Sequence, residues 1–189
     1  MRILRADNYR RMRWKNGGGE TAEIAVFPEG AGLDDFGWRV SMATVETSGP
    51  FSVFAGVART LSVLEGEGIM LSVEGRIPIG LTSRSGPLTF PADVETSAAL
   101  IAGPITDLNV MSRRGLYRHS VNLRDIDGSV ELMAESAATL LFCRSGKMLL
   151  GIDGRNEKLG RFDAAILPGP QPVRIEGRGQ FFLIEFNPV

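Results

Sequence analysis

Hydrophobic and polar positions alternate along short segments of this chain, the pattern typical of half-buried β-strands. In residues 38–43, tryptophan, valine and methionine occupy every second position, and residues 107–111 alternate in the same way. The 23 glycines and 10 prolines punctuate the chain at the spacing of short strands joined by turns. Helical periodicity is confined to one candidate turn over residues 93–99. The pattern therefore predicts an almost all-β fold.

A weak internal repeat indicates two similar halves. Residues 68–76 read GIMLSVEGR and are echoed by residues 146–155, GKMLLGIDGR. Residues 88–92, LTFPA, are echoed by residues 165–169, AILPG. An offset of about 78 positions is long for a solenoid but suits two fused barrels. A glycine-bounded hairpin, a link, a proline and a strand follow the order of a jelly roll. We therefore expect two fused double-stranded β-helix barrels of cupin type, a bicupin.

The expected domain organisation is one compact bicupin chain over residues 1–189. Its N-terminal half spans residues 1–115 and its C-terminal half spans residues 116–189, with the first ~20 residues as candidates to pack on the other half. At 189 residues, the chain can bury roughly 70% of its unfolded surface and needs no disulfides or metals to fold.

Composition and charge exclude several classes of function. The formal net charge is −1 and basic residues form no polybasic run, so we expect no direct nucleic-acid partner. No apolar run reaches 18 residues and no secretory signal is evident, which predicts a cytoplasmic protein without a membrane partner. The single cysteine, Cys143, lies in an apolar run and is interpreted as a buried, inert thiol rather than a nucleophile.

The sequence also predicts a pocket without a metal ion or other cofactor. Metal-binding cupins hold their ion with two or three histidines and a carboxylate, whereas this chain has 1 histidine, His119. We interpret His119 as a satisfied or surface residue. A carboxylate-only magnesium or calcium site is the remaining alternative, but acidic residues do not cluster at the spacing of a calcium loop.

Two segments of the N-terminal half carry side chains suited to a small anion. Residues 14–23, WKNGGGETAE, contain three consecutive glycines, whose amides either hold an anion or form a bulge at a barrel corner. Arg59 lies where a loop of small residues meets a strand. An arginine there either grips a carboxylate with two parallel hydrogen bonds or makes a structural ion pair with an acid such as Glu23 or Asp107.

A third segment is the strand pattern at residues 107–111. Asp107, Asn109 and Met111 share one face, and Arg113 is the next residue on it. Periodicity leaves open whether this face meets solvent or a ligand inside a barrel.

The three segments together resemble the HutD family, also called the HutD/Ves family. Its pattern includes WKNGGGxT, WRxS, GPFSxFxGxxR and DLNxM followed by a basic residue. These motifs occur here in order, at residues 14–21, 38–41, 49–59 and 107–111. The resemblance covers essentially the whole chain, with its signature residues before about residue 115.

The resemblance implies a bicupin without the histidine metal site and a role in histidine utilisation. Proteins of this family are thought to bind a pathway intermediate and to limit expression of the operon. The implied ligands are urocanate, formiminoglutamate or N-formylglutamate, all small carboxylates. No catalytic mechanism is established for the family, so no catalytic residue is carried over.

Resemblance and residue chemistry together give a candidate binding site. A small carboxylate needs a fixed cation, amide-type donors and apolar walls, and Arg59 is the expected carboxylate clamp. The other candidate contacts are Arg39, Arg113, Lys15, Asn16, Asn109, Thr21, Ser41, Trp14, Phe51 and Met111. Glu23 and Asp107 are expected to orient the arginines, because a carboxylate would repel an anionic ligand.

Three functions stay open on the sequence. The first is a regulator that binds a small carboxylate. The second is a metal-independent enzyme acting on a histidine-degradation intermediate, with Glu23 or Asp107 as a general base of raised pKa. The third is an interaction module with a vestigial pocket, whose strands pair into a homodimer. The lack of a Ser-His-Asp set favours the first. The sequence fixes neither the ligand nor the branch of the family, histidine-utilisation or stress-associated.

Overall fold

The computed structural model describes residues 1–167 and 169–189, whose regular secondary structure is nearly all β-strand, so the predicted all-β class is confirmed. The strands are β1 (Arg2–Leu4), β2 (Arg10–Arg13), β3 (Gly19–Phe27), β4 (Trp38–Val45), β5 (Gly49–Pro50), β6 (Val57–Glu65), β7 (Ile69–Val73), β8 (Ile79–Leu81), β9 (Leu88–Pro91), β10 (Thr96–Leu100), β11 (Ile105–Arg113), β12 (Tyr117–Ala134), β13 (Ala138–Ile152), β14 (Arg155–Leu159), β15 (Ala164–Leu167) and β16 (Gln171–Pro188). A single 3-10 turn, η1 (Ala6–Asn8), is the one helical element of the described residues. The proline of the second repeat copy, Pro168, lies outside them.

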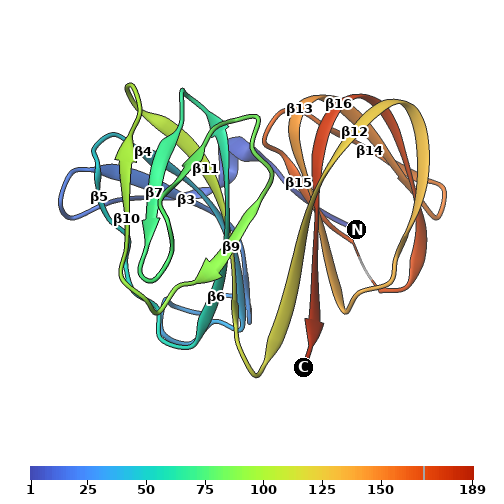
Figure 1. Cartoon of the computed structure of the whole chain (residues 1–189). Coiled ribbons are helices and arrows are strands. Elements are labelled where there is room, and N and C mark those ends of the chain that lie inside the picture. The colour runs from blue at the N-terminus through green and yellow to red at the C-terminus, as the bar shows by residue number, and fades with distance from the viewer. Residues whose placement is uncertain (168) are drawn as a thin grey trace. The chain divides into compact units, whose positions relative to one another are not determined.

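The chain divides into two compact units. The N-terminal unit is Arg10–Tyr117, and the C-terminal unit combines Met1–Tyr9 with Arg118–Val189. Figure 1 shows each unit as its own set of curved strands. The division after Tyr117 lies close to the boundary expected from the repeat, and the N-terminal segment that joins the C-terminal unit ends at Tyr9.

The N-terminal unit consists of two antiparallel sheets. The larger has the order β2-β3-β4-β11-β6-β9, and the smaller has the order β5-β10-β7-β8. Side chains alternate between the faces of a strand. One face of the larger sheet therefore presents Leu61 and Val63 to Ile69 and Leu71 of the smaller one, and these residues form a shared core. We call this side the inner face of the larger sheet.

The C-terminal unit is built on one sheet, with the order β1-β15-β13-β16-β12 and with β14 paired to β13. Residues of β13 and β16 that lie far apart along these strands, Leu141 and Ile175 among them, belong to one buried core. The sheet must therefore curve around that core, as Figure 1 shows. The N-terminal segment is fixed to it by an ion pair between Arg5 and Asp163, 2.9 Å long.

The two copies of the repeat adopt equivalent hairpins. In the first copy, β7 and β8 are joined through a turn that contains Gly75. In the second, β13 and β14 are joined through Gly154, and both glycines have φ +74°. The strand order β9-β6-β11-β4 in the N-terminal unit corresponds to β15-β13-β16-β12 in the C-terminal unit. This correspondence favours two related barrels.

The candidate helical turn at residues 93–99 is wrong. Residues Thr96–Leu100 form β10, which pairs with β7 and β5. Alanine and serine have little preference for strands, but Thr96 and Ala98 fill buried positions on one face. Packing therefore overrides local propensity at this position.

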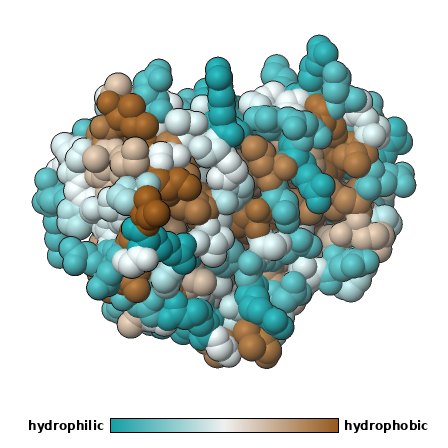
Figure 2. Space-filling model, in the orientation of Figure 1, coloured by the Kyte–Doolittle hydropathy of each residue, from teal (hydrophilic) through white to brown (hydrophobic). Residues whose placement is uncertain are grey.

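Polar residues cover most of the surface seen in Figure 2, and hydrophobic residues reach it in separate patches. The exposed large apolar side chains include Val53 and Ile77. Across the described part of the chain, no helix has the length and apolar character needed to cross a membrane.

The glycines of the second hairpin provide a test of the fold. Gly146 has φ +82°, and a Cβ built there would lie 1.9 Å from the carbonyl oxygen of Arg178, whereas a Cβ at Gly154 meets nothing within 4 Å. Gly154→Ala should cost only the strain of a positive φ, about 1–2 kcal/mol. Gly146→Ala should cost more than about 3 kcal/mol, because the opposing backbone must move. Urea unfolding of both variants measures the difference, and equal losses would contradict this close approach of the two strands.

Candidate functional site

A cluster of polar residues interrupts the apolar inner face of the larger sheet. Arg39 of β4 and Arg59 of β6 both lie opposite Met111 of the central strand β11. Two residues further along β11, Asn109 lies opposite Ser41. The side chains alternate, so these residues lie on the same face as Leu61 and Val63 and point into the barrel. The cluster is almost fully buried: its members are Arg39, Ser41, Arg59, Asp107 and Asn109, with Glu23 at its edge.

Arg59 is 7% exposed and has a neutral hydrogen-bond partner. Its Nε donates to Oδ1 of Asn109 at 2.9 Å, and a terminal nitrogen donates to the same oxygen. Its guanidinium lies 4.2 Å from the ring centre of Phe51 and 5.9 Å from that of Phe90. Among the described residues Arg59 makes no ion pair. The structural ion pair with Glu23 or Asp107, one of the two interpretations of Arg59 from the sequence, is therefore not formed.

Burial lowers the pKa of Arg59 to about 10, an effect opposed by the nearby charge of Asp107 and increased by that of Arg39. The group stays protonated at neutral pH. The barrel therefore contains a guanidinium whose positive charge is not compensated by direct contact with a carboxylate.

Arg39 differs from Arg59 in having such a contact. Its Nε lies 2.8 Å from Oε2 of Glu23, and a terminal nitrogen donates to Oγ of Ser41 at 3.3 Å. Glu23 thus pairs with Arg39, and its role in orienting an arginine stays a prediction.

Asp107 is wholly buried and reaches Arg59 only through Asn109. Its Oδ1 accepts a hydrogen bond from Nδ2 of Asn109, and its Oδ2 has no hydrogen-bond partner. Desolvation raises the pKa of Asp107 to about 6; the charge of Arg59, the hydrogen bond from Asn109 and a hydrogen bond from the backbone of Ala43 oppose the rise. The three side chains form a hydrogen-bonded series from guanidinium to amide to carboxyl.

Apolar residues border this cluster. Met111 is 3% exposed and packs with Phe36, Val57 and Ala92. Trp14 and Phe51 pack against the core between the two sheets. The indole Nε1 of Trp14 donates to Oγ1 of Thr21 at 2.8 Å, so the predicted hydroxyl already has a partner.

Three predicted contacts are not linked to the cluster by any hydrogen bond in the described residues. Lys15 and Asn16 are exposed in the loop before β3, and Oδ1 of Asn16 accepts a bond from the amide of Gly18 at 3.0 Å. The guanidinium of Arg113 donates to main-chain carbonyls of Asp34, Phe36 and Ala55, at 2.8, 3.2 and 3.3 Å. Arg113 therefore links the loop before β4 to the loop before β6 through hydrogen bonds.

The consecutive glycines have a structural explanation at two positions. A Cβ at Gly19 would lie 2.2 Å from the carbonyl oxygen of Thr44, and a Cβ at Gly18 would lie 2.6 Å from Oγ1 of Thr47. Larger residues would separate these segments. The barrel-corner interpretation accounts for both glycines without a bound anion.

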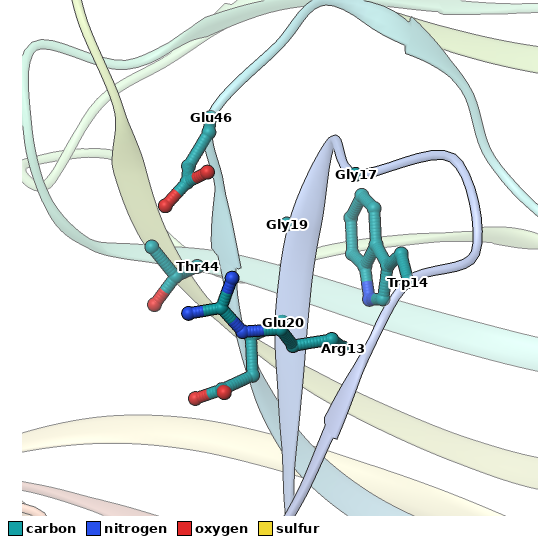
Figure 3. Close-up of a pocket in the computed structure, with 7 residues that line it drawn as sticks. All are labelled: Arg13, Trp14, Gly17, Gly19, Glu20, Thr44 and Glu46. Atoms are coloured by element: carbon teal, nitrogen blue, oxygen red, sulfur yellow. The ribbon is translucent and has the colours of Figure 1, made fainter.

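A hollow of about 200 Å³ lies beside this loop. It is lined by Arg13, Trp14, Gly17, Gly19, Glu20, Thr44 and Glu46, as Figure 3 shows. Thr44 alternates with the inward-facing Ala43, so the hollow lies on the opposite face of the sheet from the cluster. Two carboxylates and one guanidinium line this hollow, so its charge does not favour the binding of an anion. The buried cluster, and not this hollow, is the candidate carboxylate site.

Some of the corresponding positions of the C-terminal unit are apolar. Aligning the repeat places Leu167 at the position of Phe90, and the strand register then places Leu183 and Phe181 at the positions of Asn109 and Asp107. Phe181 belongs to the apolar core of that unit, and Leu183 packs against it. The same register places the buried Thr139 at the position of Arg59 and Glu185 at that of Met111. The series Arg59, Asn109 and Asp107 is therefore specific to the N-terminal unit.

The remaining candidates for chemistry lie in the C-terminal unit. Cys143 is fully buried, as predicted, and burial raises the pKa of its thiol to about 11. The ring of His119 lies 6.1 Å from that of Phe186, and burial lowers the pKa of His119 to about 4. Within residues 1–167 and 169–189, no group of three or more His, Cys, Asp or Glu residues is arranged to hold a metal ion.

Sequence reasoning missed Phe90, which forms part of the aromatic surroundings of Arg59. It lies opposite Arg59 in the pairing of β9 with β6. Phe90 lies in the repeated segment over residues 88–92, so the repeat already marked this residue as part of a strand. The repeat could not show that this strand pairs with the strand of Arg59.

Comparison with known proteins places the chain in a family. The model of the HutD family matches residues 6–184. A relative in Pseudomonas putida, called an uncharacterized 21.2 kDa protein in the hutC 3' region, is 38% identical over 98% of this chain and 96% of its own length.

Solved structures agree in fold and length. HutD from Pseudomonas fluorescens, in a structure described as its formate condition, is 35% identical with a TM-score of 0.84 and covers 100% of this chain and 98% of its own. A conserved protein of unknown function from Pseudomonas aeruginosa is also 35% identical, with a TM-score of 0.91 and 98% of both chains covered. A cupin 2 conserved barrel protein from Leptotrichia buccalis, 10% identical with a TM-score of 0.62 over 98% of this chain and 100% of its own, shows the cupin fold alone. The whole-length match in sequence and structure shows that this chain belongs to the HutD family.

Proposed function

We propose that this chain binds a small carboxylate intermediate of histidine utilisation in its N-terminal barrel and thereby limits expression of the pathway. Arg59 is the observation that supports this proposal most directly. It is a buried, protonated guanidinium bonded to a neutral amide. A carboxylate ligand would supply the missing negative charge through charge-assisted hydrogen bonds.

The surroundings of Arg59 favour a carboxylate of limited size. Charges interact strongly in a poorly solvated interior, and the ring of Phe51 shields one side of the guanidinium. The second guanidinium, Arg39, is already paired with Glu23 and contributes more weakly. Urocanate, formiminoglutamate and N-formylglutamate all carry the carboxylate that this arrangement requires.

The names of relatives support the pathway. The Pseudomonas putida relative is named for its position beside hutC, and the Pseudomonas fluorescens relative is itself called HutD. Formate, named in the description of that structure, is the simplest carboxylate and serves as a minimal probe.

Arg59→Gln tests the carboxylate clamp. The variant keeps a polar side chain but removes the charge, and it should lower the affinity for the three intermediates by about 10- to 100-fold, the value of one or two charge-assisted hydrogen bonds. Isothermal titration calorimetry measures the affinity, and Arg84→Gln, on an exposed turn, is the matched control. Equal affinities of the wild type and Arg59→Gln would contradict the proposal. If no carboxylate binds the wild type, the interpretation as a vestigial pocket replaces it.

A metal-independent enzyme is the second candidate, because Asp107 has the raised pKa of about 6 that a general base near neutral pH requires. NMR spectra of each intermediate incubated with the protein separate the two functions. New product signals that disappear in Asp107→Asn indicate catalysis, whereas line broadening without product indicates binding.

The raised pKa itself predicts how stability depends on pH. Because the folded protein holds the Asp107 proton more tightly than the unfolded chain does, the wild type is most stable relative to Asp107→Asn below about pH 4. This advantage should fall as the pH rises through about 6. The total decrease should be about 3 kcal/mol. Urea unfolding of both proteins between about pH 4 and 7 measures it. A difference that does not vary with pH would show that Asp107 ionises equally readily in both states.

A further inference from the structure

The guanidinium of Arg59 is covered on all but a small part of its surface. Arg59 is 7% exposed, and its partner Asn109 is more deeply buried. A carboxylate cannot make two parallel hydrogen bonds to a group that presents so little surface. A ligand therefore reaches this guanidinium only when one of the groups that cover it moves.

The side chains in contact with this guanidinium differ in how firmly they are held. Asn109 lies on β11, which is paired on both sides, and Phe90 lies on β9, directly opposite Arg59. Moving either of them would break the pairing of a sheet. Phe51, whose ring centre lies 4.2 Å from the guanidinium, is half-buried and lies outside the strands. Of these three contacts, Phe51 can move at the lowest cost.

Phe51 begins a short irregular segment between β5 and β6, residues 51–54, which we call the lid loop. The amide of Phe51 donates to the carbonyl oxygen of Thr96 at 2.9 Å, and the amide of Phe54 donates to that of Ala92 at 2.8 Å. Between these two anchors, Val53 is 62% exposed. A segment with few anchors and an exposed middle opens locally at a low free energy.

Both ends of the lid loop are fixed to the barrel. Before it, Gly49 and Pro50 form β5 and pair with β10. After it, the carbonyl oxygen of Ala55 accepts a bond from Arg113 at 3.3 Å, and the amide of Gly56 donates to Oδ2 of Asp93 at 3.2 Å. The loop can therefore leave the barrel and return to the same place.

We infer that residues 51–54 form a lid, which the structure shows closed and which opens to admit a ligand to Arg59. The inference rests on the proposed carboxylate site and adds the route by which a ligand reaches it. In the closed state the ring of Phe51 covers the charge through a cation–π contact. In the open state the guanidinium is free to bind a carboxylate.

Hydrogen exchange of the ligand-free wild-type protein, followed by NMR, tests whether the lid opens. The amides of Phe51 and Phe54 should exchange at least about 100-fold faster than those in the middle of β11, because the lid opens without unfolding of the sheet. Low concentrations of urea should leave these two rates unchanged, since a local opening exposes little surface. Exchange as slow as that of β11, with the same dependence on urea, would mean that the loop opens only by global unfolding and would overturn the lid.

Labelling with phenylglyoxal, which reacts with accessible guanidinium groups, tests whether the opening exposes Arg59. In Phe51→Ala, peptide mass mapping should show Arg59 labelled about 10-fold faster than in the wild type, the order expected for the loss of one cation–π contact. The exposed Arg84 should react equally in both proteins. Ile77→Ala, which removes a 90% exposed side chain of the same unit, is the matched control and should leave the labelling of Arg59 unchanged.

Equal labelling of Arg59 in the wild type and in Phe51→Ala would overturn the inference. If Phe51→Ala does not fold, Phe51→Leu takes its place, because it removes the aromatic ring but keeps an apolar side chain against the core.

Binding rates separate a lid from a fixed wall. NMR line shapes during a titration with urocanate give the association and dissociation rate constants. Loss of a lid should raise both constants of Phe51→Ala by about 10-fold, the same order as the gain in labelling, with little change in affinity. A faster dissociation with unchanged association would show that Phe51 is a fixed wall and would overturn the inference. If no carboxylate binds the wild type, the proposed function fails, while exchange and labelling decide the opening of the lid without any ligand.

Discussion

Placing a charged guanidinium inside a small β-barrel is the constraint on which the site depends. Arg59 has left water almost completely, and only neutral or aromatic groups touch it. A barrel interior normally gains stability from apolar packing, and Leu61 and Val63 on the same strand provide it. A guanidinium at this position opposes that gain, and the lowering of its pKa reflects the cost of desolvation. A buried guanidinium of this kind either serves a function or only lowers the stability of the fold.

The two units make the same point by comparison. They share the strand order around their central strands, but Phe181 and Leu183 of the C-terminal unit lie where the N-terminal unit has Asp107 and Asn109. The buried Thr139 lies at the position of Arg59. The hydrogen-bonded series of guanidinium, amide and carboxyl is thus replaced in the C-terminal unit by a hydroxyl and apolar side chains.

The sequence predicted the fold well because alternation and repetition are local signals. It also predicted that Asp107, Asn109 and Met111 share a face, which follows from the period of a strand. It could not show whether that face points to solvent or into the barrel. Nearly all of β4 and β11 is buried, so neither face of these strands is marked by a row of exposed polar residues. Arg113 shares the parity of that face, but its partners come from loops nearly 60 to 80 positions away, and no pattern within one strand could reveal them.

The route of the chain through its two units has a consequence for how they are made. Strand β1 completes the edge of the C-terminal sheet by pairing with β15, so residues near Met1 wait for partners beyond position 160. Arg10–Tyr117 is continuous and has all its pairing strands within itself, whereas the C-terminal unit is assembled from two separated pieces. During synthesis the barrel with the arginines can therefore close first. The second barrel cannot be completed until the residues of β15 have been made, so the first strand of the chain finds its place in the sheet only late in synthesis.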